Sequence, residues 1–114
     1  MLRPGTLRAA WWAWRALSHV RRAPRAGPVD GVRLPGAPRT RPADDYGVAV
    51  VLKRRHAKCL EAALVRQALF DSRGIHRKLV IGVVGPGEDF RAHAWLEGDA
   101  VDDEFVELAR YRSH

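Results

Sequence analysis

A proline- and glycine-rich stretch between Pro24 and Pro42 constrains this chain more than any other feature. Prolines and glycines recur along it, so neither a helix nor a sheet ladder can extend through it. We predict a linker or a surface loop, which divides the chain into residues 1–43 and residues 44–114. A chain of 114 residues fits one compact domain, so we expect no multi-domain arrangement.

The segment before this stretch predicts a helix. Residues 6–22 contain neither glycine nor proline, and they begin at Thr6, a residue that can cap a helix. Four large apolar residues recur at helical spacing: Leu7, Trp11, Trp14 and Leu17. We therefore expect an amphipathic helix whose tryptophan stripe belongs to the core. The alternative is that this stripe contacts a membrane surface or a partner.

The charge of the chain is positive and unevenly distributed. The net charge is +7, and no acidic residue precedes Asp30. A basic arm can bind nucleic acid, an anionic membrane or an acidic protein, although arginine can also be no more than the favoured surface cation. No apolar run approaches the roughly 20 residues that span a bilayer, and one cysteine allows no internal disulfide. We expect a soluble, cytoplasmic protein.

The second part predicts helices followed by strands. Residues 46–55 predict a short helix capped by Asp44 or Asp45, although three valines leave a strand open. The strongest helical pattern covers residues 59–73, with Gly74 as its stop. Its apolar face comprises Leu60, Ala63, Leu64, Ala68 and Leu69, so this helix should be central.

The remaining residues predict a small sheet. Residues 76–84 and 89–98 form the two strands of a hairpin around a turn at "GPGE". A third short strand is expected at about residues 100–104, and the tail from Phe105 to Ser113 has a helical pattern. Helices followed by an antiparallel sheet make an α+β fold.

Cys59 stands at the start of the predicted central helix. Free backbone N–H groups and the positive end of the helix dipole stabilise a thiolate there, and Arg54, Arg55 and Lys58 act in the same direction. The N–H of Cys59 could also stabilise an oxyanion. On position alone, however, a buried packing cysteine is the commoner case.

His93 and two aspartates could complete a site with this cysteine. Period-two alternation places His93 and Trp95 on one face of a strand, and a helix start packed on that strand would bring Cys59 close to His93. The next segment, "VDDE", offers Asp102 or Asp103 to orient the imidazole.

The order Cys, His, Asp on a helix, a strand and the next strand is that of the papain-like and transglutaminase-like superfamily. Within it, residues 57–112 resemble the leader-peptidase B proteins of lasso-peptide biosynthesis. The resemblance rests on an ordered set of motifs: a Cys-Leu helix start, a leucine-rich helix ending in Arg-Gly-Ile, "LVIGV", "HAWLE" and "VDDE". It implies a small transglutaminase-like core and a cysteine peptidase.

Carried over to this chain, the resemblance implies that Cys59 is the nucleophile and His93 the base and later the acid. It places the orienting carboxylate on Asp103, with Asp102 as the alternative, because a one-residue slip in a short strand would exchange them. The expected substrate is a lasso precursor peptide from which the leader is cut. The reaction needs no cofactor and no metal.

The resemblance also implies partners. Residues 1–50 do not match the winged-helix recognition domain that some relatives carry, so we expect a stand-alone peptidase that works with a separate leader-recognition protein and a lasso cyclase. No nucleic acid is expected. Two alternatives stay open: a transglutaminase-like acyltransferase with the same triad, and a non-catalytic basic protein that binds peptide or nucleic acid.

Overall fold

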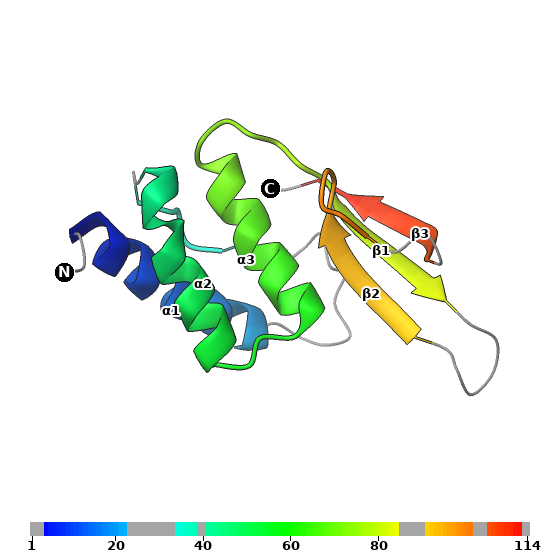
Figure 1. Ribbon diagram of the computed structural model, residues 1–114, viewed down its shortest axis with the longest axis horizontal. Helices are drawn as coiled ribbons and strands as arrows, with labels where there is room; N and C mark the ends of the chain where they lie inside the picture. The colour runs from blue at the N-terminus through cyan, green and yellow to red at the C-terminus, as the bar shows by residue number, and fades with distance from the viewer. Residues whose placement is uncertain (1–3, 23–33, 39–40, 85–90, 102–104, 113–114) are drawn as a thin grey trace.

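The computed structural model describes residues 4–22, 34–38, 41–84, 91–101 and 105–112. Its elements, in chain order, are α1 (Pro4–Arg22), the 3-10 helix η2 (Pro42–Asp44), α2 (Asp45–Arg54), α3 (Cys59–Asp71), β1 (Leu79–Val84), β2 (Arg91–Leu96) and β3 (Val106–Tyr111). Figure 1 shows α1 and α2 on one side of α3 and the sheet on the other. The prediction of an α+β fold with a central helix that begins at Cys59 is confirmed.

The helix α1 forms, but its buried face differs from the predicted one. Leu7, Trp11 and Trp14 are exposed, whereas Trp12 is buried and its indole N–H donates to the Pro35 carbonyl at 2.8 Å. Small residues dominate the buried face: Ala9, Ala13 and Ala16, together with Thr6 and Leu17. The expectation of a tryptophan stripe in the core was therefore wrong, because the alanines allow α1 to approach its neighbours closely.

Thr6 does not cap α1, since the helix begins two residues earlier at Pro4. It is buried within the helix, and its hydroxyl donates to the Asp44 carboxylate at 3.1 Å. Asp44 holds the N-cap position of α2 without a side-chain cap bond to that helix. Its carboxylate also accepts from the Arg41 backbone N–H at 3.0 Å, so it joins α1 to the start of α2.

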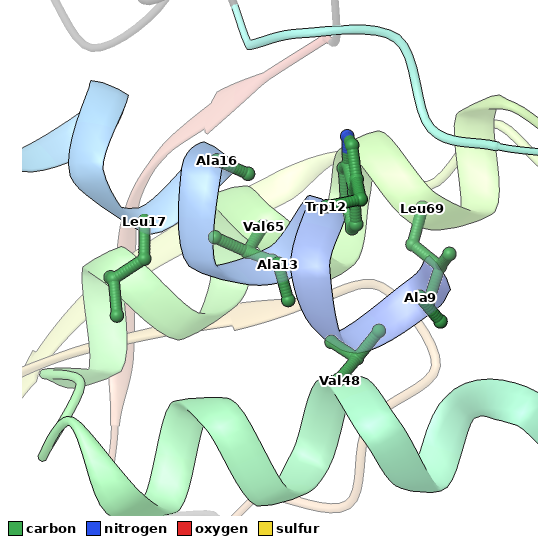
Figure 2. Close-up of a cluster of buried hydrophobic side chains, with 8 residues drawn as sticks. All are labelled: Ala9, Trp12, Ala13, Ala16, Leu17, Val48, Val65 and Leu69. Carbon is green, nitrogen blue, oxygen red and sulfur yellow. The ribbon is translucent and has the colours of Figure 1, made fainter. Parts of the chain in front are cut away.

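The three helices share one hydrophobic cluster, which we call the helical core. It consists of Ala9, Trp12, Ala13, Ala16, Leu17, Val48, Val65 and Leu69, and Figure 2 shows these side chains gathered between the helices. Part of the proline- and glycine-rich stretch also reaches it, because Leu34 and Ala37 pack against the cluster. The division at residues 43 and 44 remains a prediction.

A second cluster, the sheet core, lies on the other side of α3. It consists of Ala63, Leu64, Leu79, Ala94 and Leu96. Because α3 contributes to both clusters, it is apolar on more than one face, and the prediction that it would be central is confirmed. Gly74 follows its end with a φ of 75°, a conformation that glycine adopts without strain.

The sheet is antiparallel, with the strand order β2-β1-β3. β1 and β2 form the predicted hairpin, in which Gly82 lies opposite His93 and Ile81 opposite Ala94. The tail is not a helix, because residues from Val106 to Tyr111 form β3 and pair with β1. This pairing across a long stretch of sequence overrides the helical pattern of the tail. Residues 100 and 101 lie outside any strand, and residues 102–104, the rest of the predicted strand, fall outside the described residues.

None of the helices in the described ranges is both long enough and apolar enough to cross a membrane.

Candidate functional site

Cys59 is the first residue of α3, and its side chain is exposed. The chain arrives there from α2 through a tight connection in which His56 has a φ of 52°, and the Ala57 N–H bonds the Leu52 carbonyl at 2.9 Å. Lys58 then takes an extended conformation as the N-cap. The thiol is thus held at a helix N-terminus and open to solvent, so Cys59 is not the buried packing residue that was the alternative.

A polar network fixes the first turn of α3. The Glu61 carboxylate accepts from the Lys58 backbone N–H at 2.9 Å and from Arg21 Nε at 3.1 Å. Partial burial alone would raise the pKa of Glu61, but the hydrogen bonds from Arg21 and Lys58 outweigh it and hold this pKa below its usual value. Arg21 also donates to the Arg55 carbonyl at 2.7 Å. The end of α1 thereby holds the start of the helix that carries Cys59.

His93 lies in the middle of β2, half-buried, within an aromatic cluster. Its ring centroid is 5.7 Å from that of Trp95 and 5.3 Å from that of Phe105. The added Cβ of an alanine at Gly82 would meet the Trp95 ring at 2.5 Å, so Trp95 lies directly over Gly82. The prediction that His93 and Trp95 share a face is confirmed, and the missing side chain of Gly82 makes room for the indole.

The structure brings the segments that carry Cys59 and His93 together, but it places His93 on the sheet face that points away from α3. Leu60 packs against the sheet core, to which Ala94 belongs, so each candidate residue is the chain neighbour of a residue at the α3–β2 contact. Since strand residues alternate, His93 lies on the sheet face opposite Ala94. The structure describes both Cys59 and His93, and it shows no hydrogen bond between them.

Asp102 and Asp103, the candidates for orienting the imidazole, lie outside the described residues. Phe105, which was predicted to lie in a helical tail, contacts His93 instead. The local sequence of residues 106–111 does not alternate strictly and gave no clear signal for a strand, and so none for an aromatic residue beside the histidine. The Arg21–Glu61 pair carried no signal in the sequence either.

Gln67 has a structural role. It is buried, and its amide donates to the carbonyls of Arg77 at 2.9 Å and Tyr111 at 3.0 Å, which joins α3 to the sheet. Among the described residues, no group of three or more His, Cys, Asp or Glu side chains is placed to hold a metal ion.

Comparisons with known proteins support one family. A family model described as the transglutaminase-like superfamily matches residues 5–113. No curated protein and no solved structure matches the chain.

Proposed function

Because the chain belongs to the transglutaminase-like superfamily, we propose that it is a cysteine peptidase that removes the leader from a ribosomally made lasso precursor peptide. The family supports acyl-transfer chemistry of the cysteine protease or acyltransferase type. The observation that carries the proposal is the exposed thiol of Cys59 on the first residue of α3. The narrower assignment to leader removal rests on the motif resemblance of residues 57–112.

The proposed reaction proceeds through a thioester. His93 first takes the proton of the Cys59 thiol. The Sγ thiolate then attacks the scissile carbonyl and forms a C–S bond, while the Cys59 backbone N–H stabilises the oxyanion. The C–N bond then breaks, and the His93 imidazolium protonates the departing amine. His93 next takes a proton from water, whose oxygen attacks the thioester carbonyl. The C–S bond then breaks, which releases the leader as a carboxylic acid, and the His93 imidazolium returns the proton to Sγ.

For this reaction His93 must come within hydrogen-bond reach of Cys59. Among the strands that the structure describes, β2 is at the edge of the sheet. Because His93 lies on the sheet face away from α3, we propose that a bound peptide rearranges this edge of the sheet, a larger change than the tightening of an existing hydrogen bond.

We propose Asp103 as the residue that orients His93, with Asp102 as the alternative. The support is the contact of Phe105 with the His93 ring, since Asp103 precedes Phe105 by two residues and two residues span at most about 7 Å. Asp103→Asn should lower kcat by on the order of a hundredfold or more, and Asp102→Asn should change it little. The reverse result would transfer the role to Asp102.

The test is processing of a lasso precursor peptide in the presence of its separate leader-recognition protein, followed by mass spectrometry. Cys59→Ala should lower processing by at least about a thousandfold, and His93→Ala should have a similar effect. His76→Ala is the matched control, because His76 is an exposed histidine outside the site. Unchanged processing by Cys59→Ala would disprove the proposed function and favour a non-catalytic binding protein.

The same experiment separates hydrolysis from acyl transfer. Hydrolysis leaves a leader with a free carboxylate, and the product gains oxygen-18 when the water is labelled. An acyltransferase would instead give a leader amide when a primary amine is added. A leader amide as the main product would replace the peptidase with a transglutaminase-like acyltransferase.

A further inference from the structure

The outward side of α1 carries large apolar residues that the fold does not cover. The exposed fractions are 54% for Leu7, 66% for Trp11 and 49% for Trp14. Tryptophan is usually far more buried than this in a folded protein. A contiguous exposed apolar stripe commonly marks a binding surface, so these three side chains need a physical explanation.

Arginines border this stripe. At about 100° per residue, Leu7, Trp11 and Trp14 fall within an arc of about 60° on the helix. Arg8, Arg15 and Arg22 occupy the next arc on one side, and all three are exposed. We call these six residues the basic–aromatic face of α1.

The charge of this face has one sign. α1 contains no acidic residue. Arg55 adds a further cation, because its guanidinium carbon lies 4.1 Å from the centre of the Trp14 ring. A surface with this charge complements an anionic partner.

The shape of the face favours a lipid surface over a protein. Leu7, Trp11 and Trp14 form a narrow ridge, and a stable protein interface commonly buries more than about 1,000 Å² in total. A bilayer requires less, because an amphipathic helix binds by shallow insertion of its apolar face together with attraction of its cations to anionic headgroups. Tryptophan and arginine are residues typical of headgroup depth.

We propose that the basic–aromatic face of α1 binds the surface of an anionic phospholipid bilayer. The helix lies parallel to the membrane, with Trp11 and Trp14 among the headgroups and the arginines on lipid phosphates. This inference is independent of the proposed peptidase activity.

The experiment is co-sedimentation of the full chain with vesicles. We expect binding to phosphatidylcholine vesicles that contain about one third phosphatidylglycerol, at least about tenfold tighter than to pure phosphatidylcholine, and loss of this difference in about 0.5 M salt. Tryptophan emission should shift to the blue on binding, and brominated lipids should quench it. Equal binding to both kinds of vesicle, or no binding, would overturn the proposal.

Variants place the binding on this face. Trp11→Ser/Trp14→Ser and Arg8→Gln/Arg15→Gln/Arg22→Gln should each lower binding to anionic vesicles by about tenfold or more. Val106→Ser/Leu108→Ser is the matched apolar control, because these residues of β3 are 65% and 64% exposed, and it should bind as the unmodified chain does. Circular dichroism must show that each variant is folded.

Two other occupants are outcomes of the same test. If sedimentation equilibrium shows a dimer that Trp11→Ser/Trp14→Ser dissociates, the face joins two copies of the chain and the membrane proposal is wrong. If the tryptophan and arginine variants sediment with vesicles as strongly as the control, another surface binds lipid and the proposal is equally wrong.

Discussion

Two glycines, one in each half of the molecule, show how differently the halves are held together. At Gly47, where α2 crosses α1, an added Cβ would lie 2.3 Å from the backbone carbonyl oxygen of Thr6. At Gly82, on the side of the sheet that carries His93, the nearest atoms belong to the Trp95 ring, at 2.5 and 2.9 Å.

The difference lies in what would have to move. Relief at Gly47 requires two helices to separate, whereas the closest contact at Gly82 is with one side chain, and the backbone carbonyl oxygen of Val106 follows at 3.1 Å. The helical half is therefore fixed by close contact between backbones. The side of the sheet with the candidate catalytic histidine is packed mainly through the side chains of His93, Trp95 and Phe105.

The largest effect should come from the helical core. Leu17 is fully buried there, so Leu17→Ala should lower the free energy of unfolding by about 2–5 kcal/mol, as measured by urea denaturation. Leu108→Ala is the control, because Leu108 is 64% exposed on β3, and it should stay within about 0.5 kcal/mol of the unmodified chain. Similar losses for both would contradict the assignment of the core.

Gly47→Ala tests the helix crossing. Alanine normally stabilises a helix over glycine by about 1 kcal/mol, but here the clash with Thr6 should reverse the sign and cost about 1–3 kcal/mol. Thermal denaturation gives the change. Gly36→Ala is the control, since nothing lies within 4 Å of its Cβ. A stabilised Gly47→Ala would mean that the helices do not cross this closely.

The pair Arg66–Asp99 joins α3 to the end of β2 through two hydrogen bonds of 2.8 and 2.9 Å. The hydrogen bond from Arg66 holds the pKa of Asp99 below its usual value. The pair therefore contributes stability above the unfolded pKa of about 3.9, and this contribution is lost as the pH falls through the lowered pKa.

Asp99→Asn should thus cost about 1–2 kcal/mol at neutral pH, and the gap to the unmodified chain should narrow below about pH 4. Urea denaturation midpoints of both proteins, measured at neutral pH and below about pH 4, give this gap in stability. Glu107→Gln is the control, because the Glu107–Arg110 pair lies on the exposed surface, and it should show no measurable change. A gap that stays constant with pH would refute the role of the Asp99 charge.

Gly82→Ala should have the smallest effect on stability, below about 1 kcal/mol, because the Trp95 ring can move. It should nevertheless shift the NMR signals of the Trp95 indole and the His93 ring, and lower peptidase activity. A loss of stability as large as that of Gly47→Ala would show that both halves are equally rigid, and the comparison would fail.

Sequence patterns predicted the elements that local signals define. α3 combined a long apolar repeat with Gly74 at its end, the first hairpin strand was rich in valine and the second had strand-like alternation around His93 and Trp95, so both the helix and the hairpin were confirmed. The periodicity of α1 was also correct, but a helical wheel cannot show which arc is buried when alanines occupy one arc and Trp11 and Trp14 another. The strand β3 was missed because its pairing with β1 is a contact between distant parts of the chain.

The candidate site was predictable to a similar degree. A cysteine at a predicted helix start and a histidine within a predicted strand were found from local patterns, and the structure places both residues in those elements. The side of the sheet that faces α3 could not be inferred, because alternation gives two faces without saying which one the helix covers. Phe105 beside His93 depends on the pairing of β3, and was missed for the same reason.

One consequence follows from the position of α3 between two hydrophobic clusters. α3 contributes Val65 and Leu69 to the helical core, and Ala63 and Leu64 to the sheet core. Unfolding of α3 would therefore disrupt both clusters. The two halves should therefore unfold in a single cooperative transition. Native-state hydrogen exchange should give α1 and β1, which lie on opposite sides of α3, the same free energy of opening.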